Sequence, residues 1–229
     1  MHIDVSCGPA YAAAVCHLDG NESVFVERAA LAALSGNVSV TATLGGGGLV
    51  RGLTRRLLTE QTLIVAKYTA ARGGGWVRAA PSFPGDIAVV DIGVTGPLKA
   101  LSGAVLAYAT TVEVTTRPSG AAPLILHGGA VAVGLTGTGE IALCTYGGIE
   151  HLELAPGETV IIDSGHLVAW SAGMKMKIGP LGGPLRSVLT GEFLVGEFRG
   201  PGHVLIQTRA PNQFRGWLFP ERVEGMGHV

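Results

Sequence analysis

Short runs in which apolar and polar residues alternate recur along most of the chain, and tight turns separate them. Residues 37–43 and 111–115 alternate strictly, which is the period-2 pattern of a half-buried strand. Residues 87–92 form a largely apolar run, which suits a fully buried strand. Turn signals lie between such runs at Asp19-Gly20, Pro84-Gly85 and Pro156-Gly157. The pattern therefore predicts an all-β protein made of many short strands.

Part of this pattern returns at a nearly constant spacing. Glycine-rich segments start at Gly73, Gly137 and Gly200, so the second follows the first by 64 residues and the third follows the second by 63. A repeated β unit that cannot bury its own apolar face has to stack on its neighbours. The spacing therefore predicts tandem β-sandwich-like units that lie side by side.

The overlay of the copies sets their boundaries. Leu101–Tyr108 matches Asp163–Trp170, and the start of both matches Leu34–Val40. The copies then divide near residues 70 and 136. We predict three pseudo-repeats within one compact domain that spans residues 1–229, with the copies at about 1–70, 71–136 and 137–219.

Two segments depart from the strand pattern. Leu49, Leu53 and Leu57 recur at every fourth position of a predicted helix, Leu49–Leu58, whose other side carries three arginines. Such a helix binds a membrane surface or an acidic partner in some proteins, but an ordinary surface helix with solvated arginines is the interpretation we favour. The second segment is a short tail, residues 212–219, which we expect to dock through Trp217 and Phe219.

Composition narrows the classes of function. Of the 229 residues, 47% are hydrophobic and only 14% are charged, which is well below the usual quarter of a globular domain. Few charges leave little surface for solvation alone, which favours a chain that covers its apolar surface by self-association. The formal net charge of −1 makes nucleic acid an unlikely partner, because nucleic-acid binders carry a broad basic field.

The cysteines and the hydropathy pattern indicate the cellular compartment of the protein. Cys7, Cys16 and Cys144 are odd in number and follow no metal-ligand spacing, which fits a reduced, cytoplasmic setting. The sequence shows no secretory signal at its start, and no apolar run is long enough for a transmembrane helix. We therefore expect a cytoplasmic protein.

A series of short motifs follows one another along the chain in a specific order. The motifs are Ala33-Leu34-Ser35-Gly36-Asn37-Val38-Ser39-Val40, Pro84-Gly85-Asp86-Ile87, Pro156-Gly157-Glu158 with Val160, Asp163, His166, Val168 and Ala169, Gly191-Glu192, and Gly200-Pro201-Gly202 with Gln207-Thr208-Arg209. Together they resemble the altered inheritance of mitochondria protein 24 family, over roughly residues 20–219. The chain departs from the family pattern at Thr59-Glu60-Gln61 and at Gly191-Glu192-Phe193.

The resemblance implies a fold, but no reaction. It implies tandem units like those of the tryptophan RNA-binding attenuation protein, a topology related to the double-stranded β-helix, and a tendency to form trimers. Mitochondrial members of the family are linked to the organisation of the inner membrane. Bacterial members supply no established activity, substrate or catalytic residue, so none is transferred to this chain.

A double-stranded β-helix invites comparison with the cupins, whose metal site needs several histidines and a glutamate around one ion. Asp163 and His166 are the best candidates for metal or acid–base partners, but the position of His166 is occupied by Ala104 in the earlier copy. We therefore interpret Asp163-Ser164-Gly165 as a turn with His166 at a strand start. The other histidines considered are His127, His151 and His203, and no His-x-His occurs.

Other chemistries find less support. Cys144 lies in an apolar run, where a thiol is usually buried and inert, and no Gly-x-Ser-x-Gly nucleophile motif occurs. Binding of RNA in a ring would need a regular rim of lysines and aromatic residues. The lysines are few, and only Lys175 and Lys177 alternate on one strand face.

These observations lead to one main hypothesis and two rivals. The main hypothesis is a non-enzymatic, homo-oligomeric β scaffold or binding module, expected as a trimer, with a protein partner or a membrane surface as its possible contact. It predicts no catalytic residue, no metal site and no cofactor, and it leaves the ligand unknown. The rivals are a cupin-like metal-dependent enzyme and an RNA-binding ring.

Overall fold

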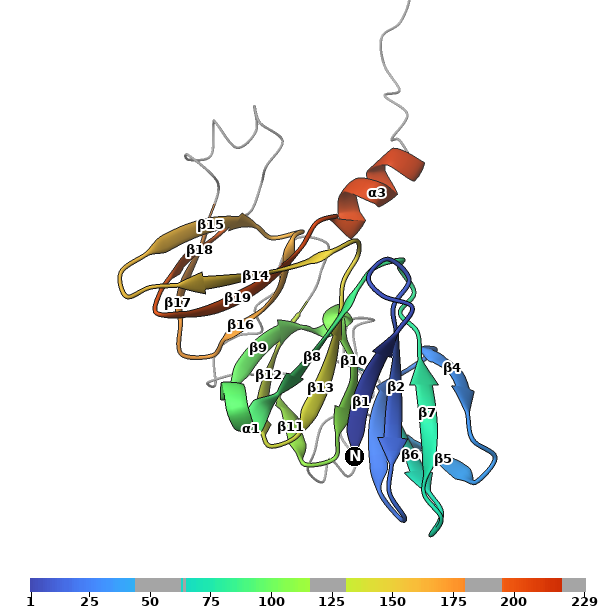
Figure 1. The fold of residues 1–229 in the computed structure, drawn as a ribbon. Helices are drawn as coiled ribbons and strands as arrows, with labels where there is room; N and C mark the ends of the chain where they lie inside the picture. Colours follow the sequence, from blue (N-terminus) through green and yellow to red (C-terminus); the bar gives the residue numbers. More distant parts are fainter. Residues whose placement is uncertain (44–62, 64, 116–130, 180–194, 220–229) are drawn as a thin grey trace, which may run out of the picture.

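The computed structural model describes residues 1–43, 63, 65–115, 131–179 and 195–219, and short antiparallel strands dominate these parts (Figure 1). The other regular elements are α1 (Ile92–Thr95), a single 3-10 turn (Ser102–Ala104) and the C-terminal helix α3 (Pro211–Leu218). The prediction of an all-β fold is therefore confirmed.

The strands form three consecutive series of six, preceded by β1 (His2–Ser6). The first series is β2 (Ala13–Leu18), β3 (Ser23–Glu27), β4 (Leu31–Leu34), β5 (Val38–Thr43), β6 (Val65–Ala70) and β7 (Gly75–Ala79). The second is β8 (Ile87–Asp91), β9 (Leu98–Leu101), β10 (Val105–Ala109), β11 (Val112–Thr115), β12 (Ala132–Gly137) and β13 (Glu140–Cys144). The third is β14 (Ile149–Leu154), β15 (Thr159–Asp163), β16 (Leu167–Ser171), β17 (Lys175–Gly179), β18 (Val195–Arg199) and β19 (Gly202–Gln207).

Every series pairs its strands in the same way. The sixth strand lies between the first and the third, and the fifth lies between the second and the fourth. Each copy is therefore a sandwich of two three-stranded sheets, as the spacing of the glycine-rich segments predicted. We call β3, β9 and β15 the second-position strands, and β4, β10 and β16 the third-position strands.

Neighbouring copies share sheets. The second-position strand of one copy pairs with the third-position strand of the next, so β3 pairs with β10 and β9 pairs with β16. This pairing fuses the half-sandwiches into four sheets, with the orders β1-β2-β7-β4, β5-β6-β3-β10-β13-β8, β11-β12-β9-β16-β19-β14 and β15-β18-β17. The copies are thus joined by backbone hydrogen bonds and not by linkers alone.

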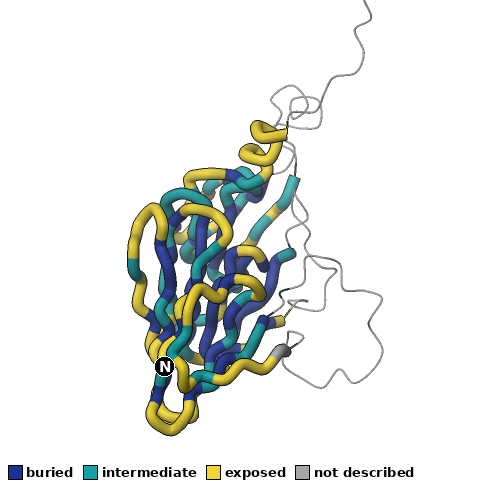
Figure 2. Tube along the Cα trace, turned by 90° about the vertical axis from the view of Figure 1, so that its right-hand side faces the viewer, coloured by how far each residue is buried: buried dark blue, intermediate teal, exposed yellow. Residues whose placement is uncertain are grey.

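Three hydrophobic cores lie between these four layers. On β13, Ala142 and Cys144 face the first core, while Ile141 and Leu143 face the second, so both faces of the inner sheet are buried. Figure 2 shows that buried residues gather in the interior strands. Because side chains alternate across a strand, such a strand must be apolar throughout. The third core is built around Trp170 and Phe198, whose rings meet edge to face at 5.7 Å.

Each third-position strand contains a β-bulge at the same place. The pairing register shifts between Leu31 and Ala33 in β4, between Val105 and Ala107 in β10, and between Leu167 and Ala169 in β16. The extra residue lets two successive side chains face the same core. Leu106 and Ala107 both belong to the first core for this reason.

The glycine-rich segments occupy equivalent turns. Gly74 and Gly200 lie in the connection between the fifth and sixth strands of a copy, and Gly137 is the last residue of the fifth strand in the second copy. Gly74 and Gly137 have φ angles of 74° and 93°. That conformation favours glycine, which explains why the repeat was visible there. The strand pairing defines units at residues 13–79, 87–144 and 149–207. These bounds differ from the predicted ones because the glycine-rich segments form turns inside each unit and do not mark its start.

The overlay of the first copy was off by one strand. Leu34 pairs with Val77 on the sixth strand, just as Tyr108 pairs with Ile141 and Trp170 pairs with Val204. The counterparts of Leu34 are therefore Tyr108 and Trp170, and its match with Leu101 and Asp163 was wrong. A Ser-Gly turn follows Leu34 as it follows Leu101 and Asp163, and this short motif produced the false register.

The connections between copies meet at one end of the sheets. Gly85 forms an isolated bridge with Gly147, the Asp86 amide donates to the Gly147 carbonyl at 3.0 Å, and the Thr145 amide donates to the Asp86 carbonyl at 3.0 Å. The ladder continues where the Thr208 amide donates to the Gly148 carbonyl at 3.0 Å. The approach is close enough that a Cβ on Gly85 would lie 2.0 Å from the Thr145 carbonyl oxygen.

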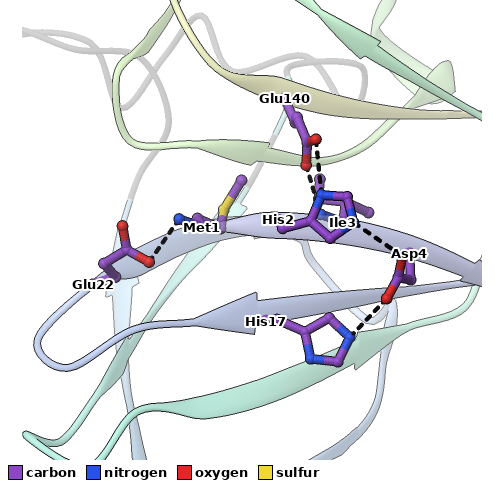
Figure 3. A network of polar contacts seen from close by, with 7 residues as sticks. All are labelled: Met1, His2, Ile3, Asp4, His17, Glu22 and Glu140. Carbon is purple, nitrogen blue, oxygen red and sulfur yellow. Dashed lines mark hydrogen bonds and ion pairs between the residues drawn. The ribbon is translucent and has the colours of Figure 1, made fainter.

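A polar network fastens β1 to the rest of the molecule (Figure 3). Glu140 on β13 accepts hydrogen bonds from the Ile3 amide and from His2 Nδ1, the latter at 3.0 Å. His2 Nε2 lies 3.0 Å from Asp4, and His17 Nε2 lies 3.1 Å from the other oxygen of Asp4. The network therefore ties the first sheet, at β1 and β2, to the second sheet at β13.

We predict that Gly85→Ala destabilises the fold, because the new methyl group collides with backbone that is held by the ladder. The expected loss is about 3 kcal/mol in the free energy of unfolding, which is a fall in Tm of roughly 10 °C for a domain of this size. Thermal unfolding followed by circular dichroism measures it. Gly36→Ala is the control, since nothing lies within 4 Å of its Cβ and its Tm should hardly change.

A second prediction concerns pH. Hydrogen bonding to Glu140 is the main cause that raises the pKa of His2, and Asp4 adds to it. Because the pKa of His2 is higher in the folded than in the unfolded state, protonated His2 stabilises the fold. This contribution is complete below the ordinary pKa of about 6.5 and is lost as the pH rises through the folded-state pKa. Hydrogen exchange of the β1 amides should therefore become faster as the pH rises through the folded-state pKa of His2, after correction for intrinsic exchange.

Glu140→Gln gives the matching variant for this pH effect. It should return the titration of His2, followed by NMR, towards its ordinary range, whereas Glu150→Gln on the distant strand β14 should leave it unchanged. An unchanged His2 titration in Glu140→Gln would show that Glu140 does not raise the pKa of His2.

Candidate functional site

The two residues that the sequence singled out, Asp163 and His166, form a turn between β15 and β16. Asp163 Oδ1 accepts a hydrogen bond from the Gly165 amide at 2.7 Å, and its carbonyl accepts one from the His166 amide at 3.0 Å. His166 Nδ1 donates to the Gln207 carbonyl at 2.7 Å. The hydrogen bonds of both side chains therefore connect this turn internally and to β19.

The remaining histidines are placed elsewhere. His151 on β14 and His203 on β19 lie with their ring centroids 4.9 Å apart, whereas His127 falls outside the described residues. Within residues 1–43, 63, 65–115, 131–179 and 195–219, no group of three or more His, Cys, Asp or Glu side chains is placed to hold a metal ion. The structure thus places His166 beside Asp163 but shows no group of three potential ligands around them in these parts.

The sequence contains two basic features, the predicted arginine-bearing helix and the pair of lysines, and the structure describes only the second. The predicted helix Leu49–Leu58 lies outside the described residues. Lys175 and Lys177 are both exposed on β17, opposite Arg199 and Glu197 of β18. They share one face of the fourth sheet, as their alternation indicated.

A hollow lies beneath α3, whose place at the end of the sheets where the connections between copies meet is seen in Figure 1. Its volume is about 590 Å³. All three copies contribute to its wall, with Phe83 from the connection between the first two copies, Tyr146 from the next connection and Leu167 from β16. Phe214 and Leu218 of α3 close one side.

Two polar side chains of this cavity, Thr145 and Gln207, are engaged with the protein itself. Thr145 Oγ1 donates within the ladder of connections, with the Gly147 carbonyl oxygen at 2.9 Å. The Gln207 amide group donates to the Gly165 carbonyl at 2.8 Å and accepts from the Tyr146 amide at 2.9 Å. The wall that a ligand would meet is therefore largely apolar.

Two titratable groups in the wall are shifted toward their neutral forms. Burial raises the pKa of the Glu27 carboxyl. Burial, followed by the nearby Glu27 charge, raises the pKa of the Cys144 thiol to about 12, so the thiol is protonated at neutral pH. A protonated thiol is a poor nucleophile, and this agrees with the interpretation of Cys144 as inert.

Aromatic rings connect α3 to the body of the protein. The centroid distances are 5.1 Å from Phe83 to Tyr146, 5.6 Å from Tyr146 to Phe214 and 6.0 Å from Phe214 to Trp217. Each pair is within the range of favourable ring contacts. The row crosses from the first connection between copies to the C-terminal helix.

The expected docking of the tail was wrong for Trp217. Trp217 is 75% exposed, and Phe219 is 70% exposed although it touches the rim of the cavity. Contact is made instead by Phe214, and by Ala210, which is buried just before the helix. Pro211 starts a helix here, and helical spacing then directs Phe214 and Leu218, four residues apart, toward the cavity.

The sequence did not reveal the cavity, since its wall comes from three connections that are far apart along the chain. The one available signal was the aromatic residue in or after each connection, at Phe83, Tyr146 and Phe214. None of the helices in the described ranges is long and apolar enough to cross a bilayer.

Known proteins resemble the chain in both sequence and fold. An uncharacterized protein of Streptococcus pyogenes is 27% identical over 208 residues, which cover 88% of this chain and 83% of that protein. A crystal structure of a Streptococcus pyogenes protein, solved by structural genomics, superposes with a TM-score of 0.76 at 25% identity and covers 95% of this chain and 97% of the other. The family model described as mitochondrial biogenesis AIM24 matches residues 4–209. This match spans nearly all of the repeated structure, and the chain therefore belongs to the AIM24 family.

Proposed function

We propose that this protein is a non-enzymatic, homo-oligomeric β scaffold that binds an apolar ligand in the cavity beneath α3. The observation that carries the proposal is the cavity itself, a hollow of about 590 Å³ with a mainly apolar wall built from all three copies. Sites for small ligands are commonly concave, apolar and of about 300–1,000 Å³.

The chemistry of the wall favours binding over catalysis. The Cys144 thiol is protonated, and the side chains of Thr145 and Gln207 are occupied by structural hydrogen bonds. Glu27 adds a carboxyl group to this mainly apolar wall, which would orient a ligand that carries a hydrogen-bond donor. Self-association is proposed because only 14% of the residues are charged.

The outer side of α3 favours a second candidate, association with a membrane surface. Trp217 is 75% exposed on this side, and Phe219, which follows the helix, is 70% exposed. Aromatic and aliphatic side chains grouped on a short helix insert into the boundary between lipid headgroups and acyl chains. The two candidates use different sides of the same helix.

Filling the cavity tests the first candidate. The Cβ position of Gly103 has nothing within 4 Å and Gly103 lines the hollow, so Gly103→Leu should occupy it without a clash at the backbone. We expect the fluorescent probe anilinonaphthalene sulfonate to bind the unmodified protein and to bind Gly103→Leu at least about 10-fold more weakly, a difference of about 1.4 kcal/mol.

Gly36→Leu is the matched control, because its Cβ also meets nothing within 4 Å but lies away from the cavity. Native mass spectrometry of the protein from its own host should in addition show a bound apolar molecule that Gly103→Leu lacks. Equal probe binding by all three proteins would refute the cavity as the ligand site.

The membrane candidate has its own measurement. Co-sedimentation with vesicles of phosphatidylcholine and phosphatidylglycerol should fall several-fold in Trp217→Ala, because the most exposed ring of the helix is removed. Tyr11→Ala removes another exposed ring, 76% exposed, outside the helix, and serves as the control. Sedimentation that is absent in the unmodified protein would rule this candidate out.

A further inference from the structure

The edges of the four sheets are of two kinds. Strands β5, β8, β11, β14 and β17 lie at a sheet edge in the first or fourth position of a copy, and the exception is β2, which β1 covers. The second- and third-position strands are different, because they pair across both boundaries between copies, as β3 with β10 and β9 with β16. Among the described strands, a second- or third-position strand keeps an open edge only at an end of the series, at β4 and at β15.

Strand β4 is apolar like its buried counterparts, yet it is exposed. All five residues of β10 and four of the five residues of β16 are buried. In β4, whose sequence is Leu-Ala-Ala-Leu, residues 31–33 are exposed and Leu31 is 41% exposed. Natural edge strands are usually protected by charges, prolines or bulges that turn them away. Strand β4 has the bulge but no charge and no proline.

Strand β15, the open edge at the other end of the series, also exposes an apolar side chain. Its sequence is Thr-Val-Ile-Ile-Asp, and Ile161 at its centre is 54% exposed. The equivalent residues of the other copies, Phe25 on β3 and Lys99 on β9, are partly buried where the next copy covers them. Ile161 therefore stays exposed at a position that a neighbouring copy covers in the rest of the series.

We propose that β15 of one copy of the protein pairs with β4 of a second copy, and so continues across the interface the pairing that joins the repeats within the chain. The internal boundaries set the register. Ala107 faces Val26 at the first boundary, and Ala169 faces Ala100 at the second. The same register places Ala33 opposite Ile162, and Leu34 opposite Ile161, of the neighbouring copy.

The side-chain directions agree with this register. Residues that face each other in an antiparallel pair point to the same side of the sheet. Leu34 packs against the first core, whereas Ile161 lies on the outer face of the fourth sheet. The joined sheet would therefore place Ile161 beside the first core of the second copy, and Ala33 beside Ile162 of the third core.

The partner has to be another molecule. Strand β4 belongs to the first sheet and β15 to the fourth, with two six-stranded sheets between them, and they lie at opposite sides of the fold (Figure 1). The contact is head-to-tail, since each copy offers β4 at one end and β15 at the other. Such contacts form a ring when the rotation closes and a filament when it does not. This inference rests on the homo-oligomeric part of the proposed function and is independent of the cavity.

A single charge at the centre of the interface provides the first test. In Ile161→Lys the new ammonium group stands opposite Glu197 on β18, so the isolated copy tolerates it, whereas the interface would have to bury it. We expect the association constant, from analytical ultracentrifugation, to fall at least about 100-fold. Val94→Lys adds the same charge at a residue that is 84% exposed on α1, and should not change association.

Engineered cysteines test the register itself. In a Cys7→Ser background, which removes the exposed native thiol, Leu34→Cys combined with Ile161→Cys should give covalent multimers on mild oxidation. Leu31→Cys combined with Ile161→Cys is the control, since these positions do not face each other in the proposed pairing. Covalent multimers only with the first pair support the proposed register. Multimers with both pairs, or with neither, overturn it.

The outcomes separate this inference from the proposal on which it rests. An unmodified protein that is monomeric at all concentrations contradicts the homo-oligomer as well as the interface. An oligomer that persists unchanged in Ile161→Lys leaves the homo-oligomer standing and overturns the β15–β4 contact. A complex of one copy with a different protein, lost in Ile161→Lys, would also overturn it, because the edge would then serve another partner.

Discussion

The pairing of a second-position strand with the third-position strand of the next copy is the interaction on which the rest of the structure depends. Without β3–β10 and β9–β16, the molecule would be three sandwiches of two small sheets, each with exposed apolar faces. With them, two continuous six-stranded sheets are buried on both faces between three cores. Hydrogen bonds that are local to two strands thus determine the layering of the whole molecule.

The same arrangement creates the candidate site. Because the sixth strand of every copy runs in an equivalent direction, each following connection emerges at the same end of the sheets. The ladder around Gly85, Thr145 and Gly147 holds these connections together, and α3 follows the last of them. A cavity at this end is therefore a consequence of the repeat, closed by a helix that has no counterpart in the earlier copies.

Much of the fold could be predicted from the sequence, because alternation, turn glycines and spacing are local signals. The alignment of the first copy with the other two could not be predicted. The Ser-Gly that follows Leu34 repeats the motif that follows Leu101 and Asp163, but it stands at a different place in the unit. The site was also hidden, because Phe83, Tyr146 and Phe214 meet only after three copies have stacked. Burial of Cys144, by contrast, followed from its apolar surroundings.

The bulge in each third-position strand has a consequence for how such a protein changes over evolutionary time. In β10 it allows Leu106 and Ala107 to face one core while Val105 and Tyr108 face the other. Loss of a single codon at that point would exchange the two faces for the remainder of the strand. Duplicated units of this kind can therefore diverge freely by amino-acid replacement, while insertions and deletions are confined to the segments between strands.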